Sequence, residues 1–324
     1  MTSTIGQTIE RNLIRWLLDE SQPGIRYHTL LDIEQKREND SEVKEAKSAL
    51  TSMGWAAAIL KEQKPNGMWQ SRPKGSLYGP KYVATNWRAI VLSDLGLDRE
   101  DARIRKTAEL FFREWMPPGV DWSKEGELCV VGNLARFMTR FGYSSDERVK
   151  ELFDWLVQSQ KEDGGWHCFE SDSGTLDCWE GLAAFAALPR RRWTRGVKRA
   201  AERGAEFYLA RGLLREGKKY APWYRFHYPN HYYYDVLVGL DTLSALGYID
   251  DPRAKPALEM MMRKRRSDGS WALDATHPDI GHGANYSLRK RATPFVLEEP
   301  GVPSKWATMV CLRVLRRLDG RQTS

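Results

Sequence analysis

A short turn motif that occurs three times constrains the fold of this chain most strongly. It reads Gln/Arg-x-x-Asn/Asp-Gly-x-Trp and spans residues 63–69, 160–166 and 265–271. Asparagine or aspartate followed by glycine makes a tight turn with a left-handed backbone position, which ends a helix. The three tryptophans lie 97 and then 105 positions apart, about the length of two helical hairpins. The chain is therefore predicted to be a helical repeat protein.

Two kinds of helix alternate around these turns. Amphipathic helices are predicted near residues 41–52, 101–115, 146–159, 194–211 and 252–265. Helices that are apolar all round, and so buried on both sides, are predicted near residues 84–95, 129–141, 178–188, 232–246 and 306–318. An N-terminal pair near 7–19 and 24–36 completes six hairpins. Because an open solenoid would carry polar capping repeats at its ends, we expect an all-α fold, an (α/α)6 toroid.

The repeats run through the whole chain without a Gly/Ser/Pro-rich linker, which predicts a single domain over residues 1–324. The 13 Trp, 13 Tyr and 10 Phe residues require burial and exclude a disordered chain. Residues 274–305 contain Gly, Pro and His but no helical period. Long irregular segments in compact domains are usually functional or wrapping segments, so a lid or a strap is expected there.

Charge and cysteine content limit the partners and the setting. The net charge is +7, but 50 basic residues are interleaved with 43 acidic ones and no nucleic-acid motif accompanies them, so we expect no nucleic-acid partner. No apolar run approaches the roughly 20 residues of a transmembrane helix. The segment Met1–Gly6 lacks the basic start of a signal peptide, and the four cysteines lack a CxxC spacing. A cytoplasmic protein is expected.

The repeated turns resemble those of the squalene cyclase and protein prenyltransferase group within the terpenoid cyclase superfamily. They are also similar to the turns of bacterial "prenyltransferase and squalene oxidase repeat" proteins. The resemblance covers almost the whole chain and implies a toroid whose central cavity holds an apolar, isoprenoid-like small molecule. The D-x-D-D run with which class II terpenoid cyclases protonate an alkene is absent from the sequence. The metal-binding D-D-x-x-D motif is also absent, because Ala254 takes its last place after Asp250 and Asp251.

Protein prenyltransferases hold zinc with an aspartate, a cysteine and a later histidine, and parts of that pattern recur here. A Gly-Gly-Trp turn at 164–166 leads into Asp177-Cys178-Trp179. Cys178 matches the family cysteine, whereas Asp177 is adjacent to it instead of two positions before it. The resemblance implies Cys178 and His231 as zinc ligands, and zinc is the candidate cofactor.

Cysteines near the starts of the apolar helices add to that site. In a toroid these helix starts converge on one rim of the central cavity, where thiolates and imidazole suit tetrahedral zinc. The predicted metal ligands are Cys129, Cys168, Cys178 and His231. Free cysteines are also commonly small buried hydrophobes, and the sequence leaves both readings open.

Reactive side chains suggest catalytic roles in the same region. A helix N-terminus lowers the pKa of a thiol and favours nucleophilic use. Asp235 is predicted one turn into an apolar helix, where a carboxylate must face a cavity or a partner. The predicted catalytic residues are Cys168, Cys178, His231, Asp235 and Asp177.

Aromatic residues near these groups are the predicted contacts to substrate. Aromatic faces can line an apolar pocket and stabilise a developing cation. The predicted substrate-binding residues are Trp179, Tyr232, Tyr234, Trp223 and His227. A loop of packed aromatic residues with hydrogen-bonded polar tips is the alternative interpretation.

Four functions remain open from the sequence. The first is a terpenoid cyclase- or prenyltransferase-like enzyme with Cys, His and Asp chemistry and a zinc ion. The second is a metal-independent hydratase or dehydratase that uses a cysteine pair, and the third is a carbohydrate lyase or hydrolase. The fourth is a binding scaffold without catalytic activity. The sequence favours an enzyme, and it leaves the oligomeric state open.

Overall fold

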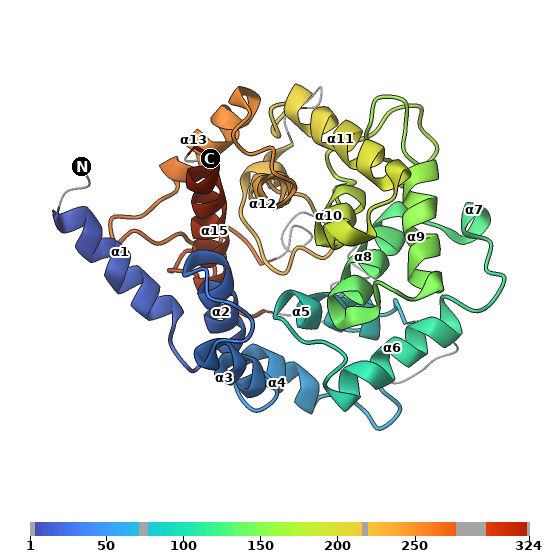
Figure 1. Cartoon of the computed structure of the whole chain (residues 1–324), viewed down its shortest axis with the longest axis horizontal. Helices are drawn as coiled ribbons and strands as arrows, with labels where there is room; N and C mark the ends of the chain where they lie inside the picture. The colour runs from blue at the N-terminus through green and yellow to red at the C-terminus, as the bar shows by residue number, and fades with distance from the viewer. Residues whose placement is uncertain (1–3, 71–76, 216–219, 277–295, 323–324) are drawn as a thin grey trace.

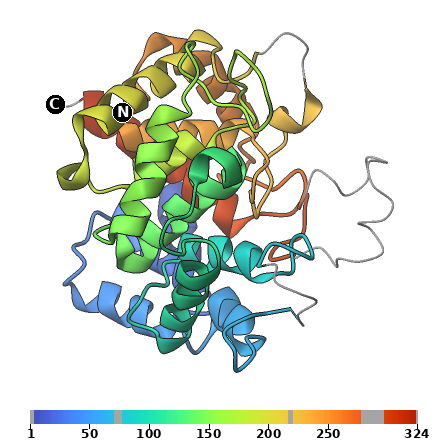
Figure 2. The ribbon, with the colours of Figure 1, turned by 90° about the vertical axis from the view of Figure 1, so that its right-hand side faces the viewer.

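The structure is a computed structural model that describes residues 4–70, 77–215, 220–276 and 296–322. These ranges contain no β-strand and only two isolated β-bridges, which join His227 to Ala275 and Ala272 to Pro303. The helices follow a ring in which the N-terminal and C-terminal helices lie side by side (Figure 1). Figure 2 shows the same ring turned by 90°. The predicted all-α toroid is confirmed.

The ring has an inner and an outer layer of helices. In the described ranges the inner helices are α2 (Pro23–His28) with its π-helical continuation η1 (Thr29–Ile33), α5 (Thr85–Asp94), α8 (Leu128–Met138), α10 (Glu180–Ala187), α12 (Val236–Leu246) and α15 (Lys305–Gln322). The outer helices are α1 (Thr4–Leu17), α3 (Ser41–Ala49), α4 (Gly54–Lys61), α6 (Ala102–Glu114), α9 (Glu147–Gln158), α11 (Arg195–Ala210) and α13 (Lys255–Arg263). Short elements in the connections are α7 (Trp122–Glu125), η2 (Thr139–Tyr143), η3 (Arg190–Arg192), η4 (Ala221–Tyr224) and η5 (Pro252–Ala254). Helix α15 packs against both α12 and α2, which closes the ring (Figure 1).

Hydrophobic periodicity separates the two layers as predicted. All ten residues of the inner helix α5 are buried. The outer helix α9 buries only Val149, Leu152, Phe153 and Leu156, which recur at the spacing of one helical face. Among the helices of the described ranges, none combines the length and the apolar character that crossing a bilayer requires.

The repeated turn motifs form the connections that the sequence predicts. Gly67, Gly164 and Gly269 have φ angles of +86°, +90° and +87°, the left-handed region that glycine adopts without strain. In the second turn, the Asp163 carboxylate accepts a hydrogen bond from the Gly165 N–H at 3.1 Å. The turn therefore fixes the direction in which the chain leaves α9.

Side chains of the same motif tie each turn to its surroundings. Trp166 donates its indole N–H to the carbonyl of Leu156, ten residues earlier, at 2.9 Å. Gln160 donates to the carbonyls of Gly164 and Ala200, both at 2.8 Å, and so joins the turn to the next outer helix. Equivalent contacts recur in the other two turns through Gln63, Trp69, Arg265 and Trp271. These groups are engaged in structure, which removes the turns from the catalytic candidates.

Aspartates cap several helices at their amino ends. Asp101, Asp146 and Asp251 each accept a hydrogen bond from the backbone N–H two residues later, at 2.7, 3.0 and 2.9 Å. Such N-caps satisfy backbone donors that have no partner within the helix. Gly247 ends α12 with a φ of +89°, as its position after the apolar run predicts.

Three predicted helix boundaries are wrong for local reasons. Helix α12 begins at Val236, because Asp235 caps it by accepting from the Val238 N–H at 2.9 Å. Helix α10 begins at Glu180, so Cys178 precedes it. The helix predicted at 41–52 is α3, which ends earlier, at Ala49. A second helix, α4, begins at Gly54, whose φ is +72°.

Residues 277–295 of the predicted irregular segment lie outside the described residues. At its near end, the Asp274 carboxylate accepts from the Phe226 N–H at 2.7 Å and from the Lys264 ammonium at 2.8 Å. At its far end, the Glu298 carboxylate accepts from Ser304 and from the Lys305 N–H, which caps α15. The lid or strap and the single-domain assignment stay predictions.

Substitution of Gly164 by alanine tests the turn. A Cβ there would lie 2.4 Å from the Arg203 carbonyl oxygen, in addition to the positive φ. Gly119 is a matched control, since its φ is +81° and a Cβ would meet nothing within 4 Å. We expect Gly119→Ala to lower the free energy of unfolding by about 1 kcal/mol and Gly164→Ala by roughly 1–3 kcal/mol more. Urea denaturation measures both, and equal losses would contradict the close packing of this turn.

Candidate functional site

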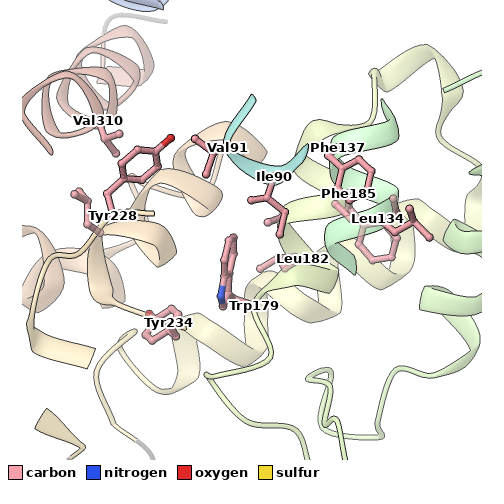
Figure 3. Packing of buried hydrophobic residues seen from close by; sticks show 14 of the residues in the cluster. Ile90, Val91, Leu134, Phe137, Trp179, Leu182, Phe185, Tyr228, Tyr234 and Val310 are labelled. Carbon is pink, nitrogen blue, oxygen red and sulfur yellow. The ribbon is translucent and has the colours of Figure 1, made fainter. Parts of the chain in front are cut away.

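A cavity of about 1150 Å³ occupies the middle of the toroid. We call one end of the cavity its outer end. This end lies where the inner helices finish, at Asp94 of α5 and Ala187 of α10. Its inner end lies at their amino ends and is lined by Trp179, Asp235 and Trp306. The cavity therefore runs along the inner helices, and Trp179 is among the buried side chains drawn in Figure 3.

The cavity wall is apolar along part of its length. Helices α10, α12 and α15 contribute small and branched apolar side chains, among them Ala183, Ala187, Leu237, Val238 and Val310. Charged and polar side chains line the rest of the cavity, among them Asp94, Arg136, Asp241 and Arg313.

Ion pairs surround the outer part of the cavity. The Arg313 guanidinium contacts the Asp241 carboxylate at 2.6 Å and the Asp32 carboxylate at 3.2 Å. Arg317 adds a contact to Asp241 at 3.1 Å. Burial alone would raise the pKa of Asp241, but Arg313 and Arg317 hold that pKa below its usual value. Two arginines balance two aspartates, so this network joins α12, α15 and η1 without excess charge.

An imidazole and a carboxylate meet at the inner end of the cavity. The Nδ1 atom of His227 lies 2.8 Å from the Asp235 carboxylate, and both side chains are 1% exposed. Asp235 also accepts from the His227 backbone N–H at 3.0 Å and from the Asn230 amide at 3.3 Å. All three residues line the cavity. Asp235 therefore fixes both the loop and the ring of His227.

The partners of His227 determine which nitrogen carries the proton. Nδ1 faces the Asp235 carboxylate and, at 3.4 Å, the carbonyl of Arg225, and both are acceptors. Nδ1 must therefore donate, which leaves Nε2 as the basic nitrogen of the neutral ring. Nε2 is buried and has no hydrogen-bond partner among the described residues. A base held by an orienting carboxylate is the arrangement used in general acid–base catalysis.

The three predicted site cysteines cluster, but away from this cavity. The Cys178 thiol donates to the Cys168 sulfur at 3.6 Å, and the Cys129 thiol also bonds to Cys168. The bonds from Cys129 and Cys178 lower the pKa of Cys168, whereas donating to Cys168 and burial raise the pKa of the other two thiols. None of the three is among the described residues that line the cavity.

Glu180 lies next to this thiol cluster as the first residue of α10. It is fully buried, and neither carboxyl oxygen has a hydrogen-bond partner among the described residues. Burial, followed by the nearby charge of Cys168, raises the pKa of Glu180 well above 4.5. Glu180 therefore keeps its proton to a higher pH than an exposed glutamate does.

The predicted zinc site is not supported. Within the described ranges, no group of three or more His, Cys, Asp or Glu side chains is placed to hold a metal ion. Its predicted ligands were Cys129, Cys168, Cys178 and His231. The His231 ring instead stacks on Tyr82 at 5.4 Å, and Asn133 donates to the His231 carbonyl at 2.8 Å. Packing of the His231 ring against Tyr82 and Trp87 explains why it does not join the cysteines.

The structure divides the remaining predicted residues between the cavity and its surroundings. Asp235, Trp179 and His227 line the cavity. The indole N–H of Trp223 donates to the Asp177 carboxylate at 2.7 Å, in a contact outside the cavity lining.

Two predicted tyrosines also lie outside the cavity lining. The Tyr232 hydroxyl lies 2.8 Å from that of Tyr82 and accepts from Lys81 at 3.1 Å. The Tyr234 hydroxyl donates to the Leu213 carbonyl at 2.8 Å within the core. The catalytic and substrate-binding roles of all these residues stay predictions.

Sequence reasoning missed most of the residues that line the cavity, and three of these bear on its chemistry. They are Arg136 on α8, Asn230 in the loop before α12 and Trp306 at the start of α15. Arg136 carried a usable signal, because a charged residue inside an apolar helix must face a cavity or a partner. Asn230 and Trp306 carried none, because only the fold shows that they line the cavity.

The fold and the cavity define the protein as an α/α toroid with an internal cavity. No family model matches the sequence, and none of the curated proteins matches it. Among solved structures, the chain is similar to type II terpene cyclase MstE from Scytonema. The apo form has 15% sequence identity, with 94% of this chain and 88% of that chain covered and a TM-score of 0.46. A variant in complex with the substrate geranylgeranyl dihydroxybenzoate has 17% identity, the same coverage and a TM-score of 0.48.

Glu180→Gln tests the raised pKa of the Glu180 carboxyl. Below pH 4.5 the carboxyl is protonated in both folded and unfolded chains, but above it only the unfolded chain releases the proton. The free energy of unfolding of the wild type therefore falls as pH rises, whereas that of the glutamine variant does not. The difference between the two, in favour of the variant, should grow by about 1 kcal/mol per pH unit. Urea denaturation at pH 5 and pH 8 measures it. Glu170→Gln, at an exposed glutamate, serves as control, and an equal pH dependence for both variants would rule out a raised pKa of Glu180.

Alkylation tests the thiol cluster. Because thiolates react and thiols do not, iodoacetamide at pH 6 should label Cys168 first among the four cysteines. Peptide mass spectrometry over a time course measures the order. The fully buried Cys311 is the internal control and should react only after unfolding. Earlier labelling of Cys129 or Cys178 would contradict the hydrogen-bond directions described above.

Proposed function

We propose that the chain is an enzyme that transfers a proton on an apolar, isoprenoid-like small molecule bound in the central cavity, with His227 as the general base. One observation carries this proposal: Nδ1 of His227 is held by Asp235, and Nε2 is buried without a partner among the described residues at the cavity. Asn230 helps to orient Asp235.

The chemistry of imidazole narrows the reaction. Protonating an isolated alkene needs a much stronger acid than imidazolium, whose ordinary pKa is about 6.5. Taking a proton near neutral pH suits imidazole well. The dyad therefore favours elimination, or the reverse addition, over a cyclisation started by alkene protonation. This agrees with the absence of a D-x-D-D run from the sequence.

The proposed step uses residues of this chain only. Nε2 takes a proton from a substrate carbon, and the electrons of the broken C–H bond form a carbon–carbon double bond. The leaving group on the adjacent carbon departs with its bonding electrons. Asp235 stabilises the imidazolium that forms, because its carboxylate stays bonded to Nδ1–H.

The cavity wall supports the substrate class. Its apolar side chains from α10, α12 and α15 would surround a hydrocarbon body. Trp179 and Trp306 offer aromatic faces at the end where the base lies, which would stabilise positive charge on the substrate.

Deuterium exchange tests the base. The protein is incubated in D2O with a panel of C10–C20 isoprenoid alcohols and acids, and mass spectrometry measures deuterium on carbon. We expect incorporation with at least one panel member, and a rate about 10²–10⁴-fold lower for His227→Gln. His167→Gln is the matched control, because His167 is not among the described residues that line the cavity.

The outcomes separate clearly. Equal exchange rates for wild type and His227→Gln would exclude His227 as the base. Absence of exchange across the panel, in protein that binds panel members, would exclude proton transfer on this substrate class.

A further inference from the structure

Arg136 is a buried cation on the cavity wall. Its guanidinium lies 4.8 Å from the ring centre of Trp179 and donates to the Asn133 side-chain oxygen at 2.9 Å. The side chain is only 6% exposed, and the residue lines the cavity. A buried charge is costly unless it is paired, so its partners decide its role.

Only one carboxylate of the described residues lies within ion-pair distance of Arg136. Asp94 is 3.6 Å away, and the same oxygen is in shorter contact with Arg140. Glu180, the next acid near Arg136, forms no ion pair with it in the described part of the chain, and burial raises the pKa of its carboxyl. Two guanidiniums thus share one carboxylate, which leaves about one positive charge in excess.

Donors without acceptors accompany this charge. Nε of Arg136, the indole N–H of Trp179 and the hydroxyl of Tyr228 are buried, and none has a hydrogen-bond partner among the described residues. Tyr228 stacks on the cavity residue Trp306 with ring centres 3.7 Å apart (Figure 3 shows Tyr228). Burial and the charge of Asp94 raise the pKa of Tyr228, so its hydroxyl keeps its proton. Unpartnered buried donors are rare, and together they favour an anionic acceptor.

We propose that Arg136, with Trp179 and Tyr228 beside it, binds a carboxylate group of the substrate, so that the enzyme acts on isoprenoid-like acids. This inference rests on the proposed function, which gives the ligand an apolar, isoprenoid-like body. It adds a carboxylate as the polar head group of that ligand. A single carboxylate matches an excess of one positive charge. A diphosphate would bring more negative charge into a cavity that Asp94, Asp235 and Asp241 already line.

Calorimetry with three ligands that share one hydrocarbon body tests the head group. The ligands are farnesoic acid, farnesol and farnesyl diphosphate. We expect wild-type protein to bind the acid about 10- to 100-fold more tightly than the alcohol, as a hydrogen bond to a charged group implies. Tighter binding of the diphosphate than of the acid would overturn the carboxylate assignment.

Variants assign the preference to Arg136. Arg136→Met should bind acid and alcohol alike while keeping its affinity for the alcohol, since Asp94 still pairs with Arg140. Tyr228→Phe removes one hydroxyl and should lower the preference about 3- to 10-fold, which keeps the test informative if Arg136→Met does not fold. Arg263→Met, at a 69% exposed arginine, is the matched control and should change nothing.

The results distinguish this inference from the proposed function. Equal binding of acid and alcohol by wild type, or an unchanged acid preference in Arg136→Met, would overturn the carboxylate site and leave His227 as base untouched. Failure of all three ligands to bind would overturn both. Deuterium exchange that requires His227 without any acid preference would support the function alone.

Discussion

The buried carboxylate of Asp235 joins the fold to the site. It caps α12 through the Val238 N–H, and it accepts from the backbone and ring of His227 and from the Asn230 amide. A carboxylate that accepts several charge-assisted hydrogen bonds is held rigidly. One side chain thus starts an inner helix, fixes the preceding loop and sets the tautomer of the imidazole at the cavity.

The toroid separates two groups of reactive side chains that the sequence analysis predicts at one rim of the cavity. The cavity holds His227 and Asp235 at its inner end, with an apolar wall beside them. Cys168 and its neighbouring thiols contact one another outside the cavity lining, beside Glu180, whose pKa burial raises. Acid–base chemistry on a bound ligand belongs to the first group, while the second group offers a perturbed thiol.

Local signals predicted the fold well. The Asn/Asp-Gly turns and the two kinds of helix depend on short stretches of neighbouring residues, and the structure confirms them. The site was predicted only in part. Asp235 was expected inside a helix, although its short carboxylate side chain suits the N-cap position it occupies. His231 was expected to join the cysteines, but its ring packs on Tyr82.

The sequence by itself determined the repeat, the two helix layers and the all-α class, because helical periodicity and turn chemistry act over short stretches of chain. Only the tertiary structure decided which charged and aromatic groups meet at the cavity. Arg136, His227 and Trp306 lie far apart in sequence. They line the same cavity because α15 closes the ring against α2. Which buried charges remain unbalanced depends on distances between helices, and those distances exist only in the folded ring.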